Sequence, residues 1–405
     1  MTEQAPAPGQ SGGVSRRRLL LGTGAGVVAL GVGGYALGRA DTAPTSDTAD
    51  IATPAPAAAA EPTIGTPIPA IGIHQAGVTA PTAPQTHCLV AVADVDRSAL
   101  SASLGDLGDA VRALTDTDDP VLDVTPDGPG DLTVTIGVGP DGLASTSRPD
   151  LAATVTLAEF AGDAKLTPDS RGGHLYLSIN ASDPLILEPV LAHLQQTVAG
   201  FRLRWSDMGY RGQVDAGVTR NPFGYHDGVI IPRTEAELAA DVWIGSGPLT
   251  GGTIVVIRRF RLDTSAFRAL PAAQQDATIG RRKIDGTPLS GGGLTDQINV
   301  NAKADNGDLL VPARAHTRAA HPSFTGSGLM LRRSYSFRNS PTDAGHMFIS
   351  FQNDIATFAK TQLRLDEVDD LMQFVTPTAT AAFAILPGMQ APSGARQALG
   401  APLFD

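Results

Sequence analysis

The sequence predicts an α+β protein with antiparallel sheets, and three observations indicate this fold class. In the first folded half, short apolar runs typical of strands alternate with two amphipathic helical segments. The second half shows a similar order of strand-like and helical segments, but less regularly. Apolar residues make up 42% of the 405 positions and aromatic residues only 5%, which is typical of a globular Ala/Val/Leu-rich chain and excludes a multispan membrane protein.

The first half is predicted to form a ferredoxin-like unit. Its strands are expected at 87–96, 132–139, 174–181 and 201–210, and its helices at 97–116 and 183–200. The resulting order, β-α-β-β-α-β, is the split pattern of that unit.

The second half is predicted to repeat the unit, although the two halves share no visible sequence identity. Strands are expected at 251–263, 329–337, 346–354 and 380–388, and helices at 264–283 and 355–373. The economical interpretation is two α+β domains, 71–215 and 216–405.

Residues 1–40 have the layout of a twin-arginine signal peptide. Arginines at 16–18 precede an uncharged stretch, 19–38, whose seven glycines argue against a membrane helix, and small residues follow near Ala40. The alternative is an uncleaved N-terminal anchor. Export through the twin-arginine machinery carries folded proteins, which suits a cofactor acquired in the cytoplasm, and it predicts an extracellular or cell-envelope location. Residues 41–70, rich in Ala, Pro and Thr, are expected to form a flexible tether.

The net charge and the cysteine content of the chain exclude some partners and bonds. The formal net charge is -11, and it becomes -14 without residues 1–40, so nucleic acid is not an expected partner. The lone Cys88 cannot form an internal disulfide. The sequence does not decide whether the chain forms a homo-oligomer.

The stretch GYHDGVIIP (224–232) places Asp227 on a turn between two glycines. Asp-Gly alone is a common turn dipeptide, so this signal is weak by itself. Further along, HTRAAHP (316–322) and MLRRSYSF (330–337) supply two histidines and two arginines. Imidazole is the usual protein ligand to haem iron, and guanidinium can stabilise negative charge on a bound peroxide.

Taken in order, these segments resemble landmarks of the dye-decolourising peroxidase (DyP-type) family of haem enzymes. The resemblance runs from about residue 73 to 389. Its other segments are HQAGV (74–78), LTVTIGVGP (132–140), FRLRW (201–205), GRRKIDGTPL (280–289), FISFQND (348–354) and ILPG (385–388). Departures are Tyr225-His226, where many relatives have Phe-Lys, and His321, which replaces the family's Asn.

The resemblance implies one haem b per chain, bound in the second half. His316 matches the axial iron ligand, and His321 is the alternative ligand. Asp354 is the candidate acceptor for the other ring nitrogen of His316, with a helix N-cap as the equally weighted alternative.

The resemblance also assigns the peroxide side of the haem. Asp227, beside Gly228, would take a proton from hydrogen peroxide and return it to the leaving oxygen, and Arg332 would hold the developing negative charge. Other candidate haem contacts have structural alternatives. Arg281 and Arg318 would bind the propionates or lie on a solvated face, and Phe351 would wall the pocket or belong to the core.

The expected function is therefore a haem peroxidase that oxidises bulky dye-like or phenolic compounds or a protein electron donor. Candidate electron relays are Trp205, Tyr210, Trp243 and Tyr335. The alternative is a haem-binding or iron-releasing, deferrochelatase-like protein with little turnover. A cofactor-free binding protein is a third option, but the glycine-rich runs 245–253 and 290–293 lack the Lys-Ser ending of a phosphate loop.

Overall fold

The structure is a computed structural model that describes residues 65–119, 121–212, 218–391 and 393–405. The predicted signal peptide and most of the predicted tether lie outside these residues, as does the predicted domain boundary at 215. Within the described ranges, no helix has both the length and the apolar character needed to cross a bilayer.

The first half forms the predicted unit. Its elements are β1 (His87–Asp94), α1 (Leu100–Leu114), β2 (Thr133–Val138), the short helix α2 (Pro140–Leu143), β3 (Leu175–Ala181), α3 (Leu187–Gln196) and β4 (Arg202–Tyr210). The strands pair antiparallel in the order β2-β3-β1-β4. Apart from α2, this is the β-α-β-β-α-β pattern of a ferredoxin-like unit.

The second half repeats that strand order. Its main elements are β7 (Thr253–Leu262), α5 (Thr264–Ala269), α6 (Ala272–Ile279), β8 (Leu331–Arg332), β9 (Tyr335–Arg338), β10 (Ala344–Gln352), α9 (Ile355–Val368) and β11 (Val375–Ile385). Strand β7 lies between β11 and β10, and β10 also pairs with β8 and β9. The fold is α+β with antiparallel pairing, as predicted.

Shorter elements connect these strands and carry much of the candidate site. They are β5 (Thr219–Arg220), β6 (His226–Asp227), α4 (Glu235–Asp241), α7 (His316–Ala319) and α8 (Pro322–Thr325).

Three predicted boundaries were wrong. The single helix expected over 264–283 is two helices, because Pro271 caps the start of α6 and Gly280, with φ 94°, ends it. The strand expected over 329–337 is interrupted between β8 and β9. The closing strand begins at Val375, five residues before the predicted start.

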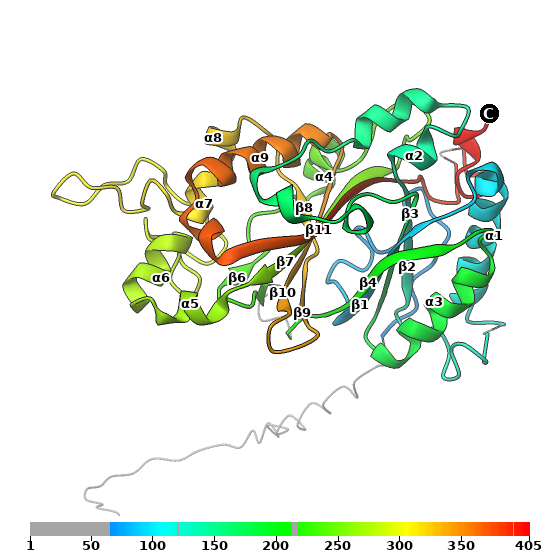
Figure 1. Cartoon of the computed structure of the whole chain (residues 1–405), viewed down its shortest axis with the longest axis horizontal. Coiled ribbons are helices and arrows are strands. Elements are labelled where there is room, and N and C mark those ends of the chain that lie inside the picture. The colour runs from blue at the N-terminus through cyan, green and yellow to red at the C-terminus, as the bar shows by residue number, and fades with distance from the viewer. Residues whose placement is uncertain (1–64, 120, 213–217, 392) are drawn as a thin grey trace, which may run out of the picture. The chain divides into compact units, whose positions relative to one another are not determined.

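The strands of the two halves share one apolar core. Alternate residues of β1, including Val90 and Val92, pack in the same cluster as Ile257 of β7 and Ile349 and Phe351 of β10. The opposite face of β1–β3 is covered by α1 and α3, which lie together at one side of Figure 1. In β10, His346 and Phe348 point away from the shared core because strand side chains alternate.

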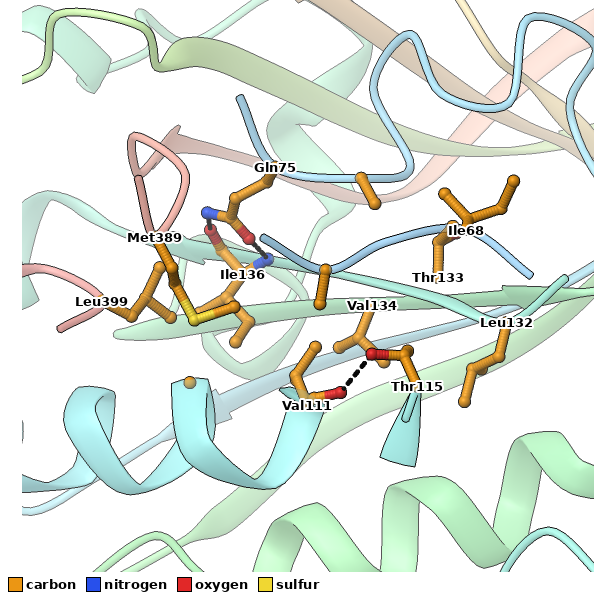
Figure 2. Close-up of a pocket in the computed structure, with 13 residues that line it drawn as sticks. Ile68, Gln75, Val111, Thr115, Leu132, Thr133, Val134, Ile136, Met389 and Leu399 are labelled. Carbon is orange, nitrogen blue, oxygen red and sulfur yellow. Dashed lines mark hydrogen bonds between the residues drawn. The ribbon is translucent and has the colours of Figure 1, made fainter. Parts of the chain in front are cut away.

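The segment before β1 is fixed by Gln75 of the HQAGV motif. Its amide nitrogen donates to the Ile136 carbonyl at 2.8 Å, and its amide oxygen accepts from the Ile136 amide (Figure 2). The same nitrogen also donates to the Leu386 carbonyl at 2.9 Å. Figure 2 also shows the adjoining void, which measures about 10 Å³ and has no titratable side chain in its lining. It has room for about one water molecule and is no candidate for catalysis.

Candidate functional site

A cavity of about 250 Å³ lies on the outer face of β7 and β10, between these strands and the segments that carry β6, α6, α7 and α9. Most of its wall is apolar. The apolar lining residues are Phe223, Val229, Ile230, Phe260, Leu262, Ile279, Ile298, Ala320, Pro322, Leu329, Met330, Phe348, Phe358, Leu365, Leu371, Met372 and Val375. Four histidines, at 226, 316, 321 and 346, also line it, together with Asp227 and Arg332. Such a wall suits a large apolar ligand held by a few polar groups.

The turn that carries Asp227 depends on its neighbouring residues. Asn221 accepts from the backbone amides of Phe223 and Tyr225 through its side chain, and Gly224, at φ 89°, closes the turn in the left-handed region. The chain then enters β6, where Asp227 pairs with Thr219 of β5. This local structure fixes the direction in which the carboxylate faces.

The Asp227 carboxylate has three cationic or N–H neighbours. One oxygen accepts from the Gly228 amide at 2.6 Å and lies 3.8 Å from Nε of Arg332. The other lies 3.3 Å from Nε2 of His346. Burial alone would raise the pKa of Asp227. The hydrogen bond and charge of His346, the charge of Arg332 and the Gly228 amide more than offset this, and hold that pKa well below its ordinary value.

The His316 ring is oriented by Asp369. Its Nδ1 lies 2.6 Å from a carboxylate oxygen of Asp369, whose side chain is fully buried, while 36% of the His316 side chain is exposed. The other Asp369 oxygen accepts from the Leu371 amide at 2.8 Å. Burial lowers the pKa of His316, but the charge and hydrogen bond of Asp369 outweigh it and raise that pKa. With Nδ1 bound to a carboxylate, Nε2 is the nitrogen left to bind a metal.

The prediction that Asp354 orients His316 was wrong, and its alternative was right. Asp354 is the N-cap of α9 and accepts from the Ala356 amide at 2.9 Å, whereas Asp369 follows the last residue of the same helix. The fourteen residues of α9 separate these two carboxylates by about 20 Å. The ion pair between Arg314 and Asp370 holds the chain after α9 beside the start of α7.

His321 lines the same cavity, but its ring caps a helix. Its Nδ1 accepts from the Ser323 amide at 3.2 Å and caps α8. Burial, with the charge of Arg318, lowers its pKa. Of these two histidines, His316 is the one whose ring is bound to a buried carboxylate.

The two predicted propionate ligands, Arg281 and Arg318, both donate hydrogen bonds to backbone carbonyls. Arg281, which lines the cavity, is 4% exposed and donates to the carbonyls of Gly286, Leu294 and Asp296. Arg318 is not part of the cavity wall, and its guanidinium donates to the Val300 carbonyl and lies over the Phe324 ring. Both arginines thus have protein partners. Arg281 is buried and does not lie on a solvated face, whereas Arg318 is half-buried.

Phe351 belongs to the shared core and is 2% exposed, so the prediction that it walls the pocket was wrong. Phe348, three residues earlier, takes that place. The sequence reasoning also missed His346 and Asp369. A period of two counted back from Ser350 would have placed His346 and Phe348 on one face. No local signal marks Asp369.

Among the tyrosines and tryptophans of the described residues, Tyr225 lines the cavity. The predicted relays, Trp205, Tyr210, Trp243 and Tyr335, are not part of its wall. The Tyr225 hydroxyl donates a hydrogen bond to Asp276 at 2.6 Å. Burial, together with the hydrogen bond and charge of Asp276, raises the pKa of Tyr225.

Known proteins resemble this chain over most of the described residues. A 286-residue match to a dye-decolorizing peroxidase of Thermobifida fusca is 32% identical and spans 64% of this chain and 65% of that relative. A deferrochelatase of Yersinia pestis is 28% identical over 93% of this chain and 92% of its own length. An oxyferrous complex of DtpA from Streptomyces lividans superposes with a TM-score of 0.76 at 30% identity, over 85% of this chain and 99% of that one.

The sequence signatures of two domains also match. Residues 75–211 match the N-terminal domain of Dyp-type peroxidases, and residues 218–390 match the C-terminal domain. Together they include every strand of the sheet and every residue of the cavity wall, so the chain belongs to the Dyp-type peroxidase family.

Proposed function

We propose that this protein is a haem-dependent peroxidase that uses hydrogen peroxide to oxidise bulky dye-like or phenolic compounds or another electron donor. The observation that carries the proposal is the joint placement of two sets of groups in one apolar cavity. One set is His316 with its buried carboxylate, and the other is Asp227 with Arg332. Neither set alone would point to peroxide chemistry.

The cavity residues fit a haem b. An imidazole with one nitrogen bound to a buried carboxylate is the donor that haem iron takes, and the aromatic and aliphatic wall suits a porphyrin. His316 would hold the iron. When bound, haem supplies the redox-active iron at which peroxide is reduced. Arg281 is not proposed as a propionate ligand, since its guanidinium donates to three backbone carbonyls, and Arg318 is not proposed because it is not part of the cavity wall.

The chain's own groups would then manage the proton and the charge of the peroxide. Asp227, kept ionised by its neighbours, accepts the proton from one oxygen of hydrogen peroxide and delivers it to the other, so that water can leave. Arg332, whose Nη1 donates to the Ile230 carbonyl at 3.2 Å, is held where it stabilises negative charge on the separating oxygen.

The relative named deferrochelatase supports a second candidate, an iron-releasing or haem-binding protein with little turnover. One stoichiometric addition of hydrogen peroxide to the haem-loaded protein separates the two functions. The peroxidase proposal expects a fast spectral change that an added phenolic donor reverses over many cycles. Slow bleaching, or loss of iron with the porphyrin intact, would favour the alternative instead.

The partner of His316 can be tested by two substitutions at the two ends of α9. Asp369→Asn is expected to weaken haem binding by about 10- to 100-fold, because the ring loses its orienting carboxylate. Asp354→Ala removes only an N-cap and should lower stability by about 1 kcal/mol with haem affinity unchanged. Haem titration and thermal unfolding measure these effects, and the reverse pattern would restore Asp354 as the partner.

Export through the twin-arginine pathway, with an extracellular or cell-envelope location, is also part of the proposal. Its support is the sequence of residues 1–40, with adjacent arginines before a glycine-rich apolar stretch. Expression of the chain with Arg16, Arg17 and Arg18 replaced by lysine tests it by fractionation. Retention of the altered protein in the cytoplasm is the expected outcome.

A further inference from the structure

His346 is the cavity histidine that contacts Asp227 directly. It lies on the outward face of β10, 15% of its side chain is exposed, and its Nε2 is 3.3 Å from Asp227 Oδ2. Its Nδ1 is buried and makes no hydrogen bond among the described residues. The His346 ring thus approaches Asp227 through its Nε2.

We infer that His346 is a positioning residue for the peroxide reaction: its Nε2–H donates to Oδ2 of Asp227, holds that carboxylate ionised, and leaves Oδ1 to face the Gly228 amide and Arg332. The inference rests on the proposed peroxidase function. It assigns His346 no contact with the cofactor. A carboxylate fixed at one oxygen offers the other in a single direction, which is what proton transfer requires.

Several titratable groups surround the pair of Asp227 and His346. His346 on β10 and Arg332 on β8 both lower the pKa of Asp227. His226 of β6, His316 of α7 and His321 line the same cavity. The register partners of His346 are Phe260 on β7 and Ser336 on β9, and neither is titratable near neutral pH. The effect of His346 is the largest of those that lower the pKa of Asp227.

Two variants of His346 test the role through the pH dependence of the peroxide reaction in the haem-loaded full chain. His346→Leu removes the donor, and the acid limb of the second-order rate constant should move up by about one pH unit or more. His346→Gln retains an N–H donor, and its limb should stay close to that of the wild type. His193→Gln, on α3, is the control for loss of a histidine elsewhere.

A second measurement needs neither haem nor activity. Nitrogen-15 NMR of histidine-labelled, haem-free protein identifies the His346 signals by their loss in His346→Gln. The wild-type ring should carry its proton on Nε2, and Asp227→Asn should change the chemical shift of that nitrogen. If Asp227→Asn leaves the His346 signals unchanged, the inference is overturned. It is also overturned if the acid limb of the rate profile stays in place in His346→Leu, or moves equally in His346→Leu and His346→Gln. A wild-type chain that binds no haem would instead overturn the proposed function, with the NMR result still deciding the pair.

Discussion

Replacing His316 with alanine is expected to abolish stable haem binding, and this is the largest effect predicted for any single substitution in the chain. The substitution removes the proposed iron ligand and leaves the buried Asp369 carboxylate without the ring that it contacts at 2.6 Å. Loss of an orienting carboxylate alone typically costs about 10- to 100-fold in metal affinity, so loss of the ligand should cost at least about 100-fold. The Soret absorbance and iron content of protein purified with haem available measure the effect.

His321→Ala is the matched control because His321 lines the same cavity. Its ring caps α8, so its removal should lower stability by about 1 kcal/mol while the Soret band and iron content remain. Added imidazole should restore the spectrum of His316→Ala by entering the space that the ring leaves. If His316→Ala keeps its haem and His321→Ala loses it, the two ligand assignments must be exchanged.

Most of the fold was predictable because it depends on local periodicity. Strand β1 is a buried, mostly apolar run, and α1 and α3 have one apolar face, so the order of such elements indicates the unit. The predicted ends of helices were wrong where a single residue stops a helix that the apolar periodicity would continue. Pro271 and Gly280 delimit α6 by their backbone geometry, while the surrounding residues keep a helical pattern.

The site was less predictable because its key contacts join residues far apart in the chain. His316 and Asp369 are separated by 53 positions, and Asp227 and His346 by still more. The resemblance to a family supplied Asp227, His316 and Arg332, which the structure places around one cavity. It could not supply the partner carboxylate, since two aspartates at opposite ends of one helix compete for that role and only the packing of α7 against the end of α9 decides.

Phe351 shows a different kind of failure. Its strand was predicted correctly, and so was its place on the same face as Ile349. Period-two alternation separates the two faces of a strand but does not say which face meets a ligand when both are buried. In this fold one face of β10 meets the core shared with β1, and the other carries His346 and Phe348 to the cavity.

Asp227→Asn and Arg332→Leu are expected to retain haem and to lose most of their reaction with peroxide. Loss of the proton acceptor should slow the reaction by about 10²- to 10⁴-fold. Loss of the charge-stabilising guanidinium should cost about 10²- to 10³-fold, or about 3 kcal/mol of barrier. Stopped-flow absorbance of the haem-loaded proteins gives both rate constants, and the unchanged Soret band shows that neither residue holds the iron.

The pH dependence of the same rates tests the state of the carboxylate. The pKa of Asp227 is lowered in the folded protein, so the group stays ionised as the pH falls through the ordinary aspartate range, and the wild-type rate should stay on its plateau down to about pH 4. In Arg332→Leu one of the charges that lower this pKa is gone, so the acid limb should move upward. Asp308→Asn and Arg338→Leu change the same residue types at exposed positions and should match the wild type in rate and profile. Wild-type rates in both cavity variants would show that peroxide reacts without Asp227 and Arg332, and the proton and charge roles would then have to be sought among other groups of the cavity wall.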